Sequence, residues 1–193
     1  KQKTAYEISL GLVGSEMCIR DSAYVKAIDL NHSKLEELKS EFGDKGIEYV
    51  ISTPNAIKDA ISESDIVIGS VYVVGKEAPK VVSKEMLGSM KEGSVLVDIS
   101  IDQGGCFESS RPTNHDEPTF IENGVIHYCV TNMPGAVPLS ATSALNTATL
   151  PFIKDLANKG IKQALNENKH LMNGLNIQNG KIIHPAIKEA LGS

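Results

Sequence analysis

The chain has 193 residues, of which 41% are hydrophobic, and this is enough apolar material for one domain plus an appendage. The formal net charge is −5 and the basic residues form no stripe, so we expect no nucleic acid partner. No apolar run approaches the roughly 18 residues of a membrane helix, so we also expect no membrane span.

Beyond the first 22 residues, short apolar runs alternate with amphipathic segments, which is typical of a parallel sheet covered by helices. The first predicted strand, residues 24–28, ends at Asp29. Asn31 or Ser33 can then cap a helix that Gly43 ends. The chain thus starts as an α/β unit.

The same pattern continues with a strand at residues 47–51 and a short helix opened by Pro54. Residues 65–71 are nearly all apolar, which predicts a central strand buried on both faces. Further strands are expected at residues 95–99 and 125–130.

Three loops follow these strands, at residues 71–79, 100–111 and 131–138. In an open α/β sheet a ligand binds beyond the carboxyl ends of the strands, so we expect the site at these loops. The predicted fold is a Rossmann-like, doubly wound parallel sheet, incomplete at its N-terminus, with a C-terminal helical tail.

The tail begins after Pro138, where the pattern becomes helical. Pro151 predicts a kink and Gly160 an end to the helix. A turn at Asn179-Gly180 and a last helix at residues 185–191 complete the expected elements, none of which extends the sheet.

Asp29 occupies the position at which dinucleotide folds hold the adenosine ribose through its 2′-hydroxyl. A carboxylate at this position also repels a 2′-phosphate. An Asp between a strand and a helix is equally an ordinary capping residue, and both interpretations stay open. Gly11 and Gly14 do not have the GxGxxG spacing of a phosphate-binding turn.

Asp102 is the candidate catalytic residue, because a buried strand leads directly into the segment Asp98-Ile-Ser-Ile-Asp-Gln-Gly-Gly105. Its carboxylate could orient water, or bind a substrate amine or a nicotinamide ribose. A turn-capping role is the alternative. Residues 132–138, rich in proline, suit either a nicotinamide-facing loop or a stiff connection to the next helix.

Histidines and cysteines give no metal signal. The five histidines are dispersed without the i, i+4 spacing of a helical metal pair. Cys18, Cys106 and Cys129 show neither CxxC nor a disulfide framework, which favours a reducing, cytoplasmic location.

Several segments together closely resemble alanine dehydrogenases. They are Val-Asp-Ile-Ser-Ile-Asp-Gln-Gly-Gly-Cys at 97–106, Arg-Pro-Thr at 111–113, Asn-Met-Pro-Gly-Ala-Val-Pro at 132–138, Ala-Thr-Leu-Pro at 148–151 and Gly-Lys-Glu-Ala-Pro-Lys at 75–80. The resemblance covers residues 23–193.

The resemblance implies NAD as cofactor and assigns site residues to it. Asp29 and Lys34 match contacts at the adenosine end, and Ser52 matches the adenine side. Asp102 matches the active-site aspartate, and Arg111 matches a further cofactor-site residue. The remaining expected cofactor contacts are Val71, Tyr72, Ile99, Ser100, Ile101, Val130, Thr131, Asn132 and Met133.

The resemblance divides the chain into three parts. Residues 1–22 do not resemble the family, residues 23–140 match its NAD-binding domain, and residues 141–193 match the segment that completes the substrate domain. The pyruvate-binding residues and the catalytic histidine have no counterpart here. Without the rest of the substrate domain, the apolar face of residues 141–193 should be exposed and promote association.

The implied activity of the intact enzyme is reversible, NAD-dependent deamination of L-alanine to pyruvate and ammonia, in a hexamer. A nucleotide-binding subunit of a proton-translocating transhydrogenase is a rival from the same family, although Ile101-Asp-Gln-Gly104 favours alanine dehydrogenase. A third hypothesis is that these 193 residues are a non-catalytic fragment that binds NAD weakly or not at all.

Overall fold

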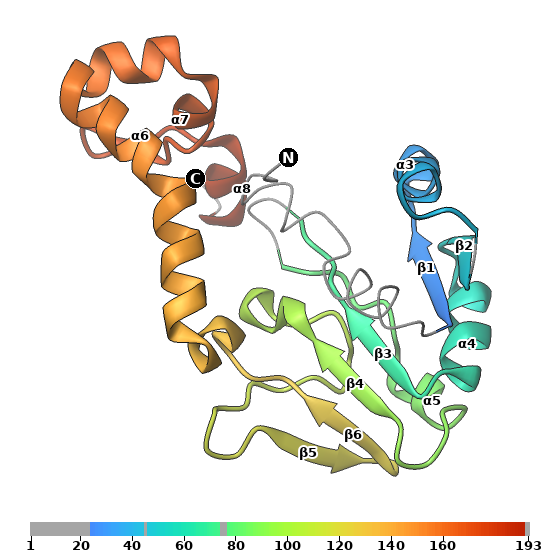
Figure 1. The fold of residues 1–193 in the computed structure, drawn as a ribbon. Coiled ribbons are helices and arrows are strands. Elements are labelled where there is room, and N and C mark those ends of the chain that lie inside the picture. Colours follow the sequence, from blue (N-terminus) through green and yellow to red (C-terminus); the bar gives the residue numbers. More distant parts are fainter. Residues whose placement is uncertain (1–23, 45, 74–76, 192–193) are drawn as a thin grey trace. The chain divides into compact units, whose positions relative to one another are not determined.

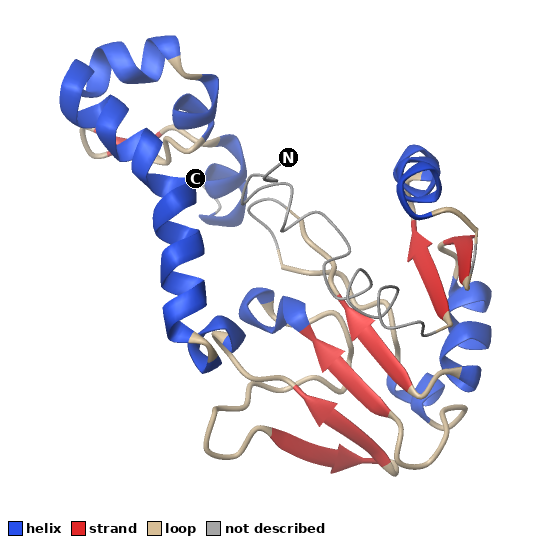
Figure 2. Cartoon of the chain, viewed as in Figure 1, coloured by secondary structure: helices blue, strands red, loops and turns tan. Residues whose placement is uncertain are grey.

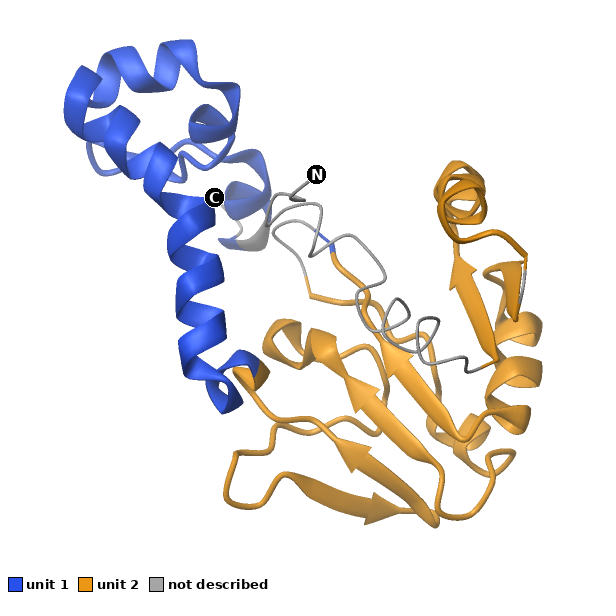
Figure 3. Cartoon of the chain, in the orientation of Figure 1, with its two compact units in different colours: residues 1–5, 73–76, 134–193 blue, residues 6–72, 77–133 orange. Residues whose placement is uncertain are grey.

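A computed structural model describes residues 24–44, 46–73 and 77–191 of the chain. The chain consists of two compact units (Figure 3). Of the described residues, the sheet unit contains those in 24–72 and 77–133, and the helical unit contains 134–191 together with Val73. None of the helices described is long and apolar enough to cross a membrane.

The first βα unit forms as predicted. Strand β1 (Val25–Asp29) leads into helix α3 (His32–Phe42), and β2 (Ile47–Ile51) pairs with β1 in parallel (Figure 1). Asn31 is the N-cap, since its side chain accepts hydrogen bonds from the backbone N–H groups of Ser33 and Lys34. Gly43 ends the helix with φ of 73°, a conformation that favours glycine.

The second βα unit is also confirmed. Helix α4 (Pro54–Glu63) carries Pro54 in its first turn and is capped by the Thr53 side chain. Its Ala60 and Ile61 are buried, and β3 (Ile66–Gly69) follows.

A second sheet has the order β3-β4-β6-β5. Its strands β4 (Val95–Asp98) and β6 (Val125–Tyr128) run parallel to β3, after the short helix α5 (Lys84–Leu87). Strand β5 (Thr119–Glu122) is antiparallel to β6 and was not predicted. The turn between them is Asn123-Gly124, both at positive φ, and such an Asn-Gly pair is the usual signal of a hairpin.

The prediction that residues 65–71 form a central strand is wrong for the described part of the chain. There β3 pairs only with β4 and is an edge strand, shorter than expected, with Ile66 58% exposed. The apolar composition of β3 is that of a strand with neighbours on both sides. Within the described residues, β1 and β2 form a separate sheet, so the expected single parallel sheet is seen as two pieces, and the second piece is mixed because β5 is antiparallel (Figure 2).

The core of the sheet unit lies beside β4. Leu96 of β4 is fully buried and belongs to one apolar cluster with Val82, Leu87, Phe107 and Val125. Because Ala78 and Phe107 of this cluster lie in the predicted loops 71–79 and 100–111, the core extends into the segments predicted to form the site.

The helical unit contains the tail. After η2 (Met133–Ala136) it comprises α6 (Pro138–Glu167), α7 (Lys169–Asn173), the hairpin β7 (Ile177–Gln178) and β8 (Lys181–Ile182), and α8 (Pro185–Leu191). The break in α6 is at Gly160, with φ of 76°, whereas Pro151 lies inside the helix. The Asn179-Gly180 turn joins β7 to β8. Exposed apolar side chains on α6 are Leu139, Leu145, Leu150, Phe152, Ile153 and Ile161.

Candidate functional site

The candidate site is built from three loops that follow parallel strands of the second sheet. The first loop, residues 70–73, follows β3, the second loop, residues 99–113, follows β4, and the third loop, residues 129–133, follows β6. Carboxyl ends of parallel strands share one edge of a sheet, where ligands of α/β proteins bind. All three loops lie in the sheet unit, apart from Val73.

A buried carboxylate organises the second loop. Asp98 is fully buried and caps the turn η1 (Ile99–Gln103). Its Oδ1 accepts from the Ser100 N–H at 3.0 Å, and its Oδ2 accepts from the Cys106 N–H at 2.9 Å and from the Ser110 hydroxyl. A buried charge is tolerated only when it is paired or hydrogen-bonded in this way. Asp98 was not among the site residues predicted from the sequence.

The backbone passes so close to Asp98 that only glycine fits at residue 105. Gly105 has φ of 74°, and a Cβ there would lie 2.8 Å from Asp98 Oδ2 and 2.9 Å from Ser110 Cβ. Both the backbone conformation and the lack of space therefore require glycine.

Ser100 joins the first and second loops. Its Oγ accepts a hydrogen bond from the Val71 N–H and donates one to the Val71 carbonyl, both at 2.8 Å. These are two of the predicted cofactor residues, brought together from 29 positions apart in the chain. Since Ser100 is buried and its hydroxyl is used for this link, it fixes loop geometry rather than presenting a polar group to solvent.

Thr113 joins the second and third loops through its backbone. Its N–H donates to the Cys129 carbonyl at 2.9 Å, and its own carbonyl accepts from the Thr131 N–H at 3.1 Å. The Asn132 carbonyl accepts from His115 Nε2 at 3.2 Å. Asn132 itself is in the left-handed region, with φ of 53°, which asparagine tolerates better than most residues.

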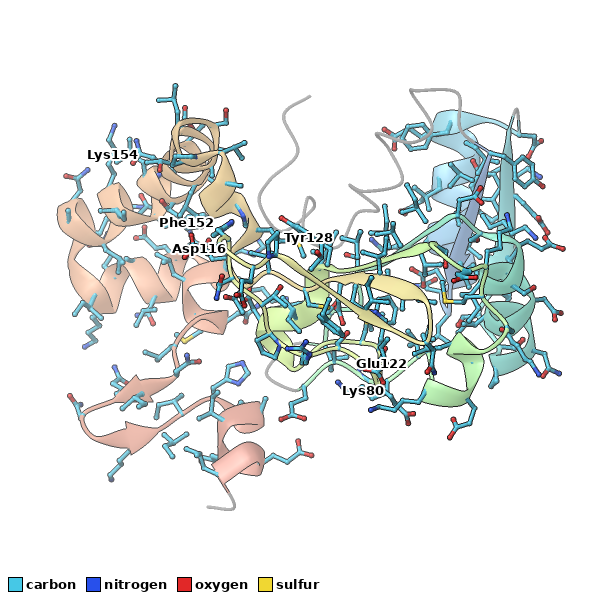
Figure 4. All side chains as sticks on the ribbon, turned by 90° about the horizontal axis from the view of Figure 1, so that it is seen from below. Lys80, Asp116, Glu122, Tyr128, Phe152 and Lys154 are labelled. Atoms are coloured by element: carbon cyan, nitrogen blue, oxygen red, sulfur yellow. The ribbon has the colours of Figure 1, made fainter. Side chains whose placement is uncertain are left out.

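Lys80 stabilises the end of the turn that carries Asp102. It was also not predicted as a site residue. Its Nζ donates to the carbonyl oxygens of Gly104 and Gly105 (side chain labelled in Figure 4). The backbone N–H of Ala78 also donates to the Gln103 carbonyl, at 2.9 Å. The signal available in the sequence was only the segment 75–80 quoted for the resemblance.

Asp102 is exposed at the end of η1. Within the described residues its carboxylate makes no hydrogen bond or ion pair, and the capping role considered for it belongs to Asp98. Its neighbours differ in exposure: Ile99 and Tyr72 are exposed, Ile101 and Val130 are buried, and Val71, Thr131 and Met133 are half-buried. The turn thus presents one carboxylate to solvent at the joined loops.

A second group of predicted residues lies at the carboxyl end of β1. Asp29 is half-buried; its Oδ1 accepts from the Asn31 N–H at 2.7 Å, and its carbonyl accepts from the Ser52 N–H at 2.9 Å. Lys34 is half-buried in the first turn of α3. The Asp29 carboxylate is thus held by a local backbone bond through one oxygen.

Arg111 is engaged in a stack of side chains. Its guanidinium carbon lies 4.1 Å from the centroid of the Phe120 ring, and Phe120 stacks on His127 with 4.7 Å between centroids. Such contacts between a cation and an aromatic face contribute about 0.5–1 kcal/mol at exposed sites. The stack ties the second loop to strands β5 and β6.

The hydrogen bonds of His127 identify its tautomer. Nδ1 lies 3.0 Å from the Val125 carbonyl, which only accepts, so Nδ1 carries the proton. Nε2 therefore accepts from the Ser109 hydroxyl, 2.8 Å away. His127 is completely buried, and this burial lowers the pKa of its imidazole, against the weaker opposing effects of the Val125 carbonyl and Glu122.

This buried histidine predicts a pH-dependent stability. Because the pKa of His127 is lower in the folded state, the unfolded chain binds the proton more tightly. The contribution of His127 to the free energy of unfolding is therefore complete above the ordinary pKa of 6.5 and is lost as the pH falls below that value. Urea titrations at about pH 7.5 and about pH 5 give the free energy of unfolding at each pH. We expect its decrease from the higher to the lower pH to be smaller in His127→Gln than in the wild-type chain. An identical fall in both would contradict this prediction.

The two described cysteines are buried free thiols. Burial, and secondarily the neighbouring Asp98, raises the pKa of Cys106 to about 12, and burial also raises the pKa of Cys129. Thiolates are the reactive form, so both cysteines are held as unreactive thiols, and Cys106 Sγ donates to Asp98 Oδ1 at 3.5 Å. The described residues contain no group of His, Cys, Asp or Glu arranged to hold a metal ion.

Comparison with known proteins gives a consistent result. The family model "Alanine dehydrogenase/PNT, C-terminal domain" matches residues 10–185, so the match begins inside the tract 1–22. Alanine dehydrogenase from Halomonas elongata is 47% identical over 185 residues, covering 94% of this chain and 50% of the relative. Alanine dehydrogenase from Lysinibacillus sphaericus is 47% identical over 171 residues, covering 88% of this chain and 46% of the relative.

Solved structures agree with these relatives. An L-alanine dehydrogenase structure matches with a TM-score of 0.82 and 42% identity, over 94% of this chain and 51% of the other. A transhydrogenase structure from Sinorhizobium meliloti matches with a TM-score of 0.68 and 25% identity, over 91% and 48%. The chain spans about half the length of the curated relatives it matches. It belongs to the alanine dehydrogenase/PNT family and corresponds to that family's C-terminal domain.

Proposed function

We propose that this chain is the nucleotide-binding part of an alanine dehydrogenase, which converts L-alanine reversibly to pyruvate and ammonia with NAD. The observation that carries the proposal is the exposed Asp102 carboxylate at the edge where three hydrogen-bonded loops meet. The transhydrogenase alternative is less well supported, because the transhydrogenase structure is 25% identical to this chain and the L-alanine dehydrogenase structure is 42% identical.

The residues present fit a nicotinamide dinucleotide. Asp29 ends its strand where the ribose of such a cofactor is held, and its Oδ2 makes no hydrogen bond within the part of the chain that is described. That oxygen is thus available to accept from a ribose hydroxyl. Lys34, Ser52 and the three loops supply the remaining expected contacts. When bound, NAD supplies the acceptor for the hydride that leaves the alanine Cα.

The protein contributes position and proton movement. Asp102 can accept a proton from the substrate amine or from water because its carboxylate is exposed and uncommitted within the described residues. The Ser100 link to Val71 and the Lys80 link to Gly104 hold the turn on which Asp102 lies. A general base must be held within hydrogen-bond reach of the proton it takes, so this fixed turn is part of the proposal.

Assembly and location follow from the family resemblance and from the thiols. We expect the intact enzyme to be a homo-oligomer, a hexamer by resemblance, and the exposed apolar residues of α6 to take part in association. Two buried free thiols suit a reducing compartment, which supports a cytoplasmic location.

The proposal predicts a preference for NADH over NADPH that depends on Asp29. In Asp29→Asn the charge that repels a 2′-phosphate is lost and the bond to the ribose is weakened, so we expect the preference to fall by about tenfold or more. Fluorescence titration of the 193-residue chain with each nucleotide measures it. Asp59→Asn, an exposed change on α4, is the matched control and should leave both affinities unchanged. Equal binding of both nucleotides by the unmodified chain would refute the assignment of Asp29.

A further inference from the structure

Asp98 holds both ends of the turn that presents Asp102. Its Oδ1 receives the N–H of Ser100 near the start of the turn, and its Oδ2 receives the N–H of Cys106, three residues beyond the turn's last residue, Gln103. One carboxylate therefore closes a loop of backbone around itself, with Gly105 packed directly against it. Neither Asp98 oxygen can be replaced by a donor without leaving a buried N–H without a partner.

The contacts of Asp98 also reach the other two loops. Ser100, held at its N–H by Asp98, is the residue whose hydroxyl bonds both backbone groups of Val71 in the first loop. Ser110, whose hydroxyl donates to Asp98, lies 3.8 Å from the Cys129 Sγ of the third loop. Asp98 is thus a single buried group to which all three loops are connected through one intermediate residue at most.

We propose that Asp98 is a positioning residue: it fixes the three loops relative to one another and so places Asp102 against the nucleotide. This inference rests on the proposed function. Asp98 does not touch the ligand, because it is fully buried beneath the loops that would. Its effect passes through Ser100 and Ser110. Misplacement of a site by about 1 Å can cost on the order of a hundredfold in function, so loss of this group should be visible in binding.

Asp98→Asn tests the proposal without changing the volume of the side chain. However the amide is turned, its NH2 faces either the Ser100 N–H or the Cys106 N–H, because each Asp98 oxygen receives one of them. Val125→Ala is the control for stability alone. Val125 is fully buried at the start of β6, whereas the register that pairs Val97 with Tyr128 puts Asp98 beyond the other end of that strand.

The experiment measures NADH affinity of the 193-residue chain and both variants at a temperature where circular dichroism shows all three folded. We expect Asp98→Asn to weaken NADH binding about tenfold or more, and Val125→Ala to leave it within about twofold. Unchanged affinity in folded Asp98→Asn, or equal weakening in both variants, overturns the proposal. If Asp98→Asn does not fold, Ser100→Ala, which removes the hydroxyl that bonds both backbone groups of Val71, takes its place under the same criteria.

Amide hydrogen exchange separates this proposal from the proposed function. If the unmodified chain does not bind NADH, the proposed function fails for this chain, but exchange of the Val71 N–H still reports on Asp98. Faster exchange at Val71 in Asp98→Asn, relative to the Ile126 N–H, which is bonded to the Ser94 carbonyl inside the sheet, supports the positioning role. An unchanged ratio of the two exchange rates overturns it.

Discussion

Gly69→Ala is expected to lower the free energy of unfolding by about 3 kcal/mol, at the upper end of what overpacking a core costs. Gly69 ends β3. A Cβ at this position would overlap the Sγ of Cys106 and lie 2.5 Å from the Cζ of Phe107. Both neighbours are themselves buried, at 0% and 1% exposure, so neither side chain can turn outward to make room. The strand or the second loop must move instead.

Gly88→Ala is the matched control for this substitution. Gly88 follows α5 with φ of −63°, which any residue adopts, and a Cβ there would meet nothing closer than the Glu85 carbonyl at 3.5 Å. Its free energy of unfolding should change by about 0.5 kcal/mol or less. Urea titration of both variants gives the comparison. A loss below about 1 kcal/mol in Gly69→Ala would mean that β3 is not packed against the second loop as described.

Local signals predicted the first half of the sheet unit well. The Asn31 cap, the Gly43 stop and the Pro54 start all act through neighbouring backbone groups, so a short stretch of sequence contains the whole cause. The hairpin at Asn123-Gly124 had an equally local signal and was missed, because residues 125–130 were interpreted as a strand after a loop rather than as half of a hairpin.

The position of β3 could not be predicted in the same way. Its apolar composition indicates burial on both faces, but burial depends on which strands and helices lie beside it, and in the described residues only β4 does. The composition of a strand indicates only the degree of burial for which it is suited. It does not report whether the strands and helices that would bury it are present in a given stretch of chain.

The candidate site also has one part that the sequence predicted and one part that it did not. Its location followed from a rule about parallel sheets, which needs only the order of strands and loops. The groups that fix it, Asp98 and Lys80, bond residues 2 to 25 positions away, mostly at backbone atoms, so the residue types of their partners give no signal for these roles. Asp98 was visible only as the last residue of an apolar strand, and Asp102, four residues later, attracted the functional assignment.

Asp102→Asn is expected to abolish most of the turnover of an assembled enzyme. Since this chain spans about half of its relatives, residues 24–193 would be fused behind the N-terminal half of the Halomonas elongata alanine dehydrogenase, and alanine-dependent NADH formation would be followed. We expect kcat to fall about a hundredfold or more, the usual contribution of a general base. Asp116→Asn, an exposed change in the loop before β5 (Figure 4), should leave kcat within about twofold.

The interpretation of that result depends on where the loss appears. Asn matches Asp in size, and Asp102 makes no hydrogen bond within the described residues, so the thermal midpoint should stay within about 1 °C. A group that accepts a proton in the transition state lowers kcat and kcat/KM together, whereas a group that only binds substrate raises KM and leaves kcat unchanged. A raised KM with unaltered kcat would therefore reassign Asp102 from proton transfer to substrate binding. Full activity in Asp102→Asn would remove Asp102 from the site, although the joined loops would remain.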